Sequence, residues 1–368
     1  MPQPGRLYRI RRHYHARLYH VLTLCGLIAL ASVLLPASAQ TTPASLPAMR
    51  AADVSVSGLA SGGDMAVQFD IAYSATVKGA GVIAGAPYDC ARGRAERAAT
   101  VCGCAGPAPC RVQPGGTNVQ ELAAATERYA EQGAIDPTAN LAAHRIWLFS
   151  GSADTLVPEP VVNDLRHYYA RYTEAIVYRN DIAAQHAMPT DGYGPPCAVL
   201  APPYLNNCAF DAAGELLDWI YGGLDMKSAA PPAGRFIAFD QARFLRQPAR
   251  HGMAATGYLY LPPDCEASRG EGCRLHVAFH GCGQNARAIG DKFIRNAGYN
   301  AWADTNRIMV LYPQAAPRQA GASACGDWQN FGDPRHARKN GRQMAAVKAM
   351  VDRLTGGARP AAAPASGS

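Results

Sequence analysis

The sequence predicts an α/β fold, in which a mostly parallel sheet carries helices on both faces, within a single domain that contains disulfides. Short apolar runs bounded by glycine, proline or small polar residues predict buried strands, and the runs from Arg145 to Phe149 and from Ile308 to Pro313 are the clearest. Amphipathic segments alternate with these runs, as from Asn118 to Gln132. Strands that alternate with helices are typical of parallel sheets, because parallel neighbours need a long crossover connection.

The first 39 residues predict a secretory signal. They hold five arginines and no acidic residue, then a mostly apolar run from Val21 to Leu35, then the small residues Ala37-Ser38-Ala39. The alternative is an uncleaved membrane anchor, but an apolar run of about 15 residues is shorter than the roughly 20 that a membrane span needs. We therefore expect cleavage near Ala39, a secreted or periplasmic protein, and no membrane association after cleavage.

Removing the signal also changes the charge of the chain. The formal net charge is +7, and losing the five arginines lowers it to +2. A nearly neutral body without a basic run argues against nucleic acid as a partner. We expect residues 40–355 to form one catalytic domain, and residues 356–368, rich in alanine, proline, serine and glycine, to be a disordered tail. The sequence does not indicate an oligomeric state.

Cysteine usage agrees with export. Ten of the eleven cysteines follow the predicted cleavage site. An even number of cysteines in an exported chain predicts disulfides. Cys197 with Cys208, and Cys265 with Cys273, are natural local pairs across short loops.

Zinc is the alternative for one cysteine cluster. Cys102, Cys104 and Cys110 lie close together in the sequence. Their spacing differs from the pair of Cys-x₂₋₄-Cys units that is usual in zinc sites. We therefore expect no metal, and nothing in the sequence indicates a cofactor.

The stretch from Val54 to Gln68 predicts a strand, a sharp turn and a helix. This is the layout of a nucleophile elbow, which exposes a serine at the top of an α/β-hydrolase sheet within a Gly-x-Ser-x-Gly motif. The glycines are required because side chains two residues on either side of the nucleophile would collide. In this chain Ala60 occupies the place midway between Gly58 and Gly62, and the hydroxyl is one residue later, on Ser61.

Two further residues follow in the order that the chemistry requires. Acyl transfer by an activated hydroxyl needs a histidine base and a carboxylate that orients it, and α/β-hydrolases place them in the order Ser, Asp, His. Asp154 follows one predicted strand, and His186 follows the next. Alone, Asp154 could be a helix cap and His186 a loop histidine. Together they favour a catalytic triad with the elbow.

An apolar strand that ends in His280-Gly281-Cys282-Gly283 predicts the second donor of an oxyanion hole. In ordinary α/β-hydrolases this loop precedes the elbow, whereas here it follows it. A circular permutation explains the order, with Gly222 to Pro232 as the joint. The alternative for His280 and Cys282 is a buried strand end closed by a disulfide, and the two interpretations are compatible.

At these motifs the chain resembles the poly(3-hydroxybutyrate) depolymerase family, in its circularly permuted catalytic-domain type. The matches extend over nearly the whole mature chain. They are Ser57-Gly58-Leu59-(Ala60)-Ser61-Gly62-Gly63, Pro87-Tyr88-Asp89-Cys90, Gly151-Ser152-Ala153-Asp154-Thr155, His186 with Pro189-Thr190-Asp191, Trp219-Ile220-Tyr221-Gly222, His280-Gly281-Cys282, Trp302-Ala303-Asp304-Thr305-Asn306 and Tyr312-Pro313-Gln314.

The resemblance implies roles for individual residues. Asp154 and His186 become triad members, and the backbone N–H groups of Ser61 and Cys282 form the oxyanion hole. The family's nucleophilic serine falls on Ala60. Trp328 is a candidate substrate contact, with core packing as the alternative. The resemblance also implies the disulfides Cys197–Cys208, Cys265–Cys273 and Cys282–Cys325, and leaves Cys90, Cys102, Cys104 and Cys110 to pair among themselves.

Three functions follow from these observations. The first is a serine esterase that cleaves poly- or oligo(3-hydroxybutyrate), with Ser61 as a displaced nucleophile beside Asp154 and His186. The second is a catalytically impaired protein that binds the same esters, because Ala60 stands at the nucleophile position. The third is a carboxylesterase for feruloyl or acetyl groups. In each case the partner is an ester substrate, and for the first two it is a polyester or oligoester.

Overall fold

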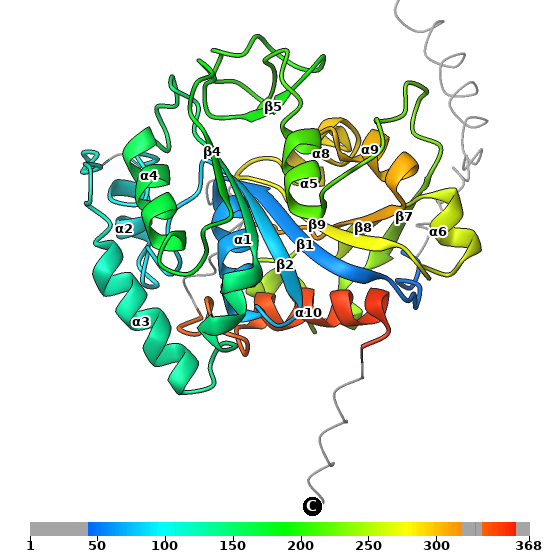
Figure 1. The fold of residues 1–368 in the computed structure, drawn as a ribbon, viewed down its shortest axis with the longest axis horizontal. Coiled ribbons are helices and arrows are strands. Elements are labelled where there is room, and N and C mark those ends of the chain that lie inside the picture. The colour runs from blue at the N-terminus through cyan, green and yellow to red at the C-terminus, as the bar shows by residue number, and fades with distance from the viewer. Residues whose placement is uncertain (1–42, 107, 318–327, 329–332, 358–368) are drawn as a thin grey trace, which may run out of the picture. The chain divides into compact units, whose positions relative to one another are not determined.

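The computed structural model describes residues 43–106, 108–317, 328 and 333–357 (Figure 1). The predicted signal at residues 1–39 and all but two residues of the predicted tail lie outside this part of the chain. None of the helices formed by the described residues is long and apolar enough to span a membrane.

A twisted sheet of eight strands forms the centre of the described structure (Figure 1). Its strand order is β4-β3-β2-β1-β9-β10-β8-β7. The neighbours from β4 to β10 are parallel, whereas β8 and β7 are antiparallel to their neighbours. The prediction of a mostly parallel sheet is therefore confirmed. The strands span Ala52–Leu59 (β1), Val77–Ile83 (β2), Arg145–Phe149 (β3), Ile176–Arg179 (β4), Arg235–Asp240 (β7), Thr256–Leu261 (β8), Arg274–Phe279 (β9) and Ile308–Tyr312 (β10).

The first strand of the chain lies in the middle of this sheet. β1 pairs with β2 on one side and with β9 on the other, so that Gly58 is opposite both Val82 and Phe279. The C-terminal part of the chain thus completes the half of the sheet that precedes the elbow in unpermuted α/β-hydrolases. This is the arrangement that circular permutation produces.

Helices cover both faces of the sheet, as expected. Successive residues of β2 face opposite sides: a Cβ at Gly81 would contact Leu216 of α5, whereas the Val82 side chain lies next to Gly63 of α1. The α-helices are Ser61–Ala72 (α1), Ala95–Thr100 (α2), Val119–Glu131 (α3), Glu159–Tyr169 (α4), Ala212–Tyr221 (α5), Pro263–Ala267 (α6), Ala286–Ile289 (α7), Lys292–Asn296 (α8), Tyr299–Asn306 (α9) and Arg342–Thr355 (α10). A separate parallel pair, Met188–Thr190 (β5) and Leu205–Asn207 (β6), follows β4 in the chain.

Disulfides join cysteines that are close in the sequence. Cys197–Cys208 and Cys265–Cys273 form as predicted. The early cysteines pair among themselves, as the resemblance implies. The predicted partner of Cys282, Cys325, lies outside the described residues. The pairs in the early cluster are Cys90–Cys102 and Cys104–Cys110.

A polar cluster around the fully buried His276 joins β1 to β9. The two ring nitrogens of His276 lie 2.7 Å from the hydroxyl oxygens of Ser55 and Ser57. Tyrosine hydroxyls complete the cluster, with Tyr221 bonded to Ser55 and Tyr299 to Ser57. Burial without a countercharge lowers the pKa of His276 to about 3. The histidine is therefore neutral in the folded protein over the whole physiological range.

This neutral histidine predicts a loss of stability in acid. Once unfolded, His276 binds a proton near pH 6.5, whereas the folded protein takes one up only near pH 3. The unfolded state therefore binds more protons between these limits, and the free energy of unfolding falls as the pH falls, by up to about 1.4 kcal/mol per pH unit from this group. Urea unfolding from pH 6.5 to 4.5 measures it. His276→Gln should lower the slope of the free energy of unfolding against pH by close to the value for one proton. An unchanged slope would contradict the assignment of His276 as neutral in the folded protein.

Candidate active site

The turn between β1 and α1 is centred on Ala60. Its backbone angles are φ 54° and ψ −121°, and a positive φ is rare for a residue with a side chain. The Ala60 N–H donates to the carbonyl of Ile83 (2.9 Å), while its own carbonyl accepts from the N–H of Asp64 (2.8 Å). These bonds connect Ala60 to β2 on one side and to the first turn of α1 on the other. The geometry is that of a nucleophile elbow.

The two flanking glycines are sterically required. A Cβ at Gly58 would lie 2.2 Å from the carbonyl oxygen of Gly62, and a Cβ at Gly62 would lie 2.3 Å from that of Phe279. Both distances are far below van der Waals contact, so neither position tolerates a side chain. Because these glycines lie two residues before and two residues after Ala60, the tip of the elbow is residue 60.

Ser61 occupies a different place. It is the first residue of α1, and its Oγ is buried without a hydrogen-bond partner among the described residues. The position two before it is Leu59, which is buried at the end of β1. The structure therefore gives the Ser61 hydroxyl no hydrogen bond to His186. Its backbone N–H is the first of α1 and follows the elbow tip directly.

Asp154 and His186 meet at the carboxyl edge of the sheet. Asp154 lies in the loop after β3, and its Oδ2 is 2.8 Å from Nδ1 of His186. Its Oδ1 accepts the backbone N–H groups of Leu156 and Val157, both at 2.8 Å, so both carboxylate oxygens are occupied. A carboxylate only accepts hydrogen bonds, so Nδ1 carries the proton. Nε2 is then the basic nitrogen, as a general base requires.

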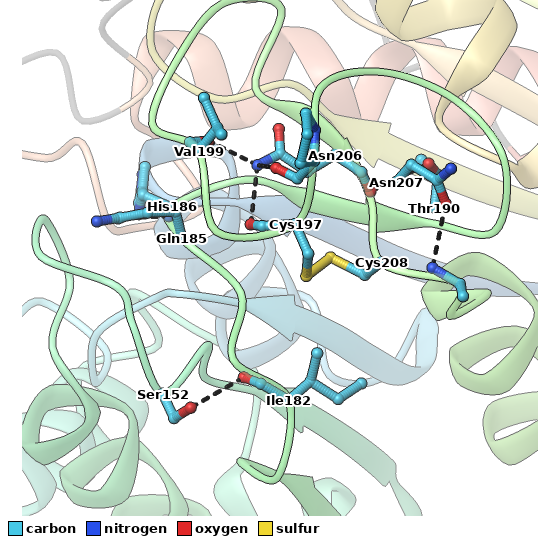
Figure 2. Close-up of a disulfide and its surroundings, with 12 residues drawn as sticks. Ser152, Ile182, Gln185, His186, Thr190, Cys197, Val199, Asn206, Asn207 and Cys208 are labelled. Atoms are coloured by element: carbon cyan, nitrogen blue, oxygen red, sulfur yellow. Dashed lines mark hydrogen bonds between the residues drawn. A yellow bond between two sulfur atoms is a disulfide. The ribbon is translucent and has the colours of Figure 1, made fainter.

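A disulfide-closed loop holds His186 in place (Figure 2). The backbone N–H of Gln185 donates to the carbonyl of Cys197, and that of Met188 to the carbonyl of Tyr204. Inside the loop, the amide of Asn206 donates to three carbonyls, those of Pro196, Cys197 and Val199. The loop at residues 197–208 therefore fixes the backbone on both sides of His186.

The second predicted donor, Cys282, lies in the turn after β9. β9 is the direct neighbour of β1, so this turn lies beside the elbow: a Cβ at Gly281 would be 3.1 Å from the carbonyl oxygen of Leu59. His280 supports the turn from within the core. Its Nδ1 donates to the carbonyl of Gly281 (2.8 Å), and its Nε2 accepts the N–H of Ala315 (3.0 Å). Burial lowers the pKa of His280 to about 4.

Trp328 packs behind this turn. Its side chain is fully buried, and its indole N–H donates to the carbonyl of His280 (2.9 Å). Its ring meets that of Phe279 edge-on at 5.2 Å. This arrangement agrees with the core-packing alternative for Trp328. A direct contact between Trp328 and substrate stays a prediction.

Sequence reasoning missed two glutamines at the site. Gln185 directly precedes His186, and its Oε1 accepts the His186 N–H (2.9 Å). Gln284 follows the predicted oxyanion turn and bonds to both sides of the site. The only signal was their adjacency to His186 and to the His280–Gly283 motif, and adjacency alone does not indicate the partners.

The fold and the site together define an α/β-hydrolase: a permuted parallel sheet with an elbow, an aspartate–histidine pair and an oxyanion-type turn along one edge. No family model matches the chain. It is 44% identical over 324 residues to the poly(3-hydroxybutyrate) depolymerase of Delftia acidovorans, covering 86% of this chain and 63% of that protein. It is 36% identical over 339 residues to the polyhydroxybutyrate depolymerase of Talaromyces funiculosus, covering 87% of this chain and 95% of that protein.

Solved structures give the same result. A PHB depolymerase from Penicillium funiculosum matches with a TM-score of 0.75 at 34% identity, covering 86% of this chain and all of that one. A serine-to-alanine variant of a PHB depolymerase complexed with an R3HB trimer matches with a TM-score of 0.76, at the same identity and coverage. The chain belongs to the poly(3-hydroxybutyrate) depolymerase family, whose members are carboxylic ester hydrolases.

Proposed function

We propose that this protein binds esters of poly- or oligo(3-hydroxybutyrate) at the carboxyl edge of its sheet, and that Asp154 and His186 serve their hydrolysis. The observation that carries the proposal is the 2.8 Å bond between these two residues at the same sheet edge as the elbow. The named substrates of the relatives support the choice of ester. The variant bound to an R3HB trimer supports it further, because there a related fold with alanine in place of a serine holds the oligomer.

Each residue has a defined part in this reaction. His186 Nε2 removes a proton from the attacking oxygen, and Asp154 stabilises the imidazolium that forms. The N–H groups of Ser61 and Cys282 bind the carbonyl oxygen as it becomes negatively charged. A serine at position 60 would attack the ester carbonyl and give an acyl-enzyme, which water then hydrolyses.

Ala60 limits this chemistry in the chain as it stands. Alanine supplies no nucleophilic oxygen, so an acyl-enzyme cannot form at residue 60. Without a triad member, an acyl-transfer site retains only about 10³–10⁴-fold acceleration over water, from binding and the oxyanion hole. The native chain therefore binds these esters far more effectively than it cleaves them.

Ser61 is the second candidate nucleophile, and one observation favours it. Its Oγ has no hydrogen-bond partner among the described residues, so no hydrogen bond has to break before it reacts, although the atom is buried. Against it, the elbow glycines frame residue 60, and Ser61 is already the first residue of α1. We therefore propose that Ser61 contributes its backbone N–H to the oxyanion hole and is not the nucleophile.

Export completes the proposal. The predicted signal at residues 1–39 would carry the chain out of the cytoplasm, and the four disulfides among the described residues suit an oxidising compartment. The periplasm and the external medium both provide such conditions and access to oligoesters.

Calorimetry on the purified native protein tests the binding claim. We expect saturable binding of a soluble (R)-3-hydroxybutyrate trimer, with a Kd at least about tenfold lower than that for a feruloyl sugar ester. The trimer should be recovered uncleaved after the titration, because Ala60 prevents rapid turnover. Tighter binding of the feruloyl ester would favour the third function, and no binding of either ester would overturn the proposal.

A further inference from the structure

Gln284 uses its whole side-chain amide to join two parts of the active site. The side chain is buried, with 1% of its surface exposed. Its Oε1 accepts the N–H of Gly281 (2.7 Å), inside the turn that follows β9. Its Nε2 donates to the carbonyls of Pro203 (3.0 Å) and Tyr204 (2.9 Å), in the disulfide-closed loop. One acceptor and two donors are thus all used.

The loop on the far side of these bonds is the one that holds His186. The carbonyl of Tyr204 accepts from Gln284 and also from the N–H of Met188, two residues after His186. The same loop accepts the N–H of Gln185 at Cys197. Two hydrogen bonds that share the carbonyl of Tyr204 therefore connect Gln284 to Met188, two residues after His186.

The turn on the near side is fixed against the elbow. A Cβ at Gly281 would lie 2.9 Å from Gln284 Oε1 and 3.1 Å from the carbonyl oxygen of Leu59. Gly283 has φ +70°, and a Cβ there would lie 3.6 Å from the ring of Tyr204. The turn thus fits between β1 and the disulfide-closed loop, and Gln284 bonds it to the loop.

We propose that Gln284 is a positioning residue that sets the Cys282 N–H in register with His186. It contacts neither substrate nor the reacting atoms. Its three bonds fix the oxyanion turn relative to the loop at residues 197–208, which holds the backbone around His186. A shift of about 1 Å in such an arrangement can cost about 100-fold in rate. The inference rests on the proposed function, because it assigns Cys282 and His186 their catalytic parts.

The first test uses an active background. In Ala60→Ser protein, Gln284→Met keeps the length and volume of the side chain and removes its three bonds. We expect kcat on a nitrophenyl ester to fall about 100-fold with KM changed less than about twofold, because the substrate contacts remain. Gln241→Met is the matched control: Gln241 is equally buried, and its amide makes the same three bonds, to the backbone of Ala254 and Gln314.

The outcomes separate this inference from the proposed function. If kcat is unchanged, or falls no further than in the Gln241→Met control, Gln284 has no positioning role and the proposed function stands. If Ala60→Ser itself hydrolyses no ester, the proposed function fails, and hydrogen exchange on the native protein decides for Gln284. Gln284→Met should then speed exchange at Gln185 and Met188, as well as at Gly281, by about tenfold or more. Faster exchange at Gly281 alone would overturn the proposed coupling.

Discussion

Replacing Ala60 by serine is expected to raise kcat/KM for a short-chain nitrophenyl ester by about 10⁴-fold or more. The substitution adds one hydroxyl at the tip of an elbow whose backbone is already in the nucleophile conformation, with φ 54° and ψ −121°. Serine has the same backbone preferences as alanine at such a position, so the folded structure need not change. Initial rates of the native and Ala60→Ser proteins, at equal concentrations of folded protein, measure the gain.

A neighbouring alanine supplies the control for this gain. Ala84 follows β2 directly, is buried, and also has a positive φ of 51°. Ala84→Ser therefore repeats the substitution at a strand end beside the elbow, and we expect no increase in rate. The Ala60→Ser prediction would fail if the substituted protein stayed as slow as the native chain on every ester offered.

In the Ala60→Ser background, Asp154→Asn should lower kcat by about 10⁴-fold. The carboxylate now accepts from Nδ1 of His186 at 2.8 Å, which leaves Nε2 free of a proton. An asparagine amide can donate to Nδ1 of His186 and so favours the tautomer with the proton on Nε2. In that tautomer Nε2 cannot accept the proton of the attacking hydroxyl. Rates for Ala60→Ser with and without Asp154→Asn measure the loss.

The chain contains a matched aspartate–histidine pair away from this site. Asp70 lies 2.8 Å from Nδ1 of His144, and both side chains are buried. The Nε2 of His144 lies 3.0 Å from the carbonyl oxygen of Ser74, so both of its nitrogens face acceptors and the ring has no free base. Asp70→Asn should cost stability but leave kcat within about threefold at a temperature where the protein is folded. A similar loss of kcat in both variants would mean that Asp154 acts only through stability.

Residue patterns predicted the parts of the site that depend on local sterics. The elbow could be located because its glycine spacing follows from backbone crowding within five residues, and Gly58 and Gly62 prove to be where a Cβ cannot fit. The loops that hold Asp154 and His186 could be located because each follows a short apolar run, and these runs form β3 and β4. Their bond then follows from the parallel sheet, whose carboxyl ends share one edge.

The contacts that the sequence did not predict join residues far apart in the chain. Ser55 and Ser57 alternate with valines, a pattern that usually predicts one polar, exposed face. Both serines are instead fully buried, because His276 of β9 provides polar partners inside the core. Gln284 was missed for the same reason, since its partners lie in the loop around Tyr204. Contacts of this kind depend on which strands and loops are neighbours in the folded sheet. The local sequence around each residue does not contain that information.

The central claim is that residue 60 occupies the nucleophile position and is an alanine in this chain. A fluorophosphonate probe tests this claim most directly. The probe modifies only a serine that an adjacent base activates, and peptide mapping by mass spectrometry locates the modified residue. We predict stoichiometric modification at residue 60 in the Ala60→Ser protein, and no modification of the native protein. Modification of the native protein at Ser61 would contradict the account.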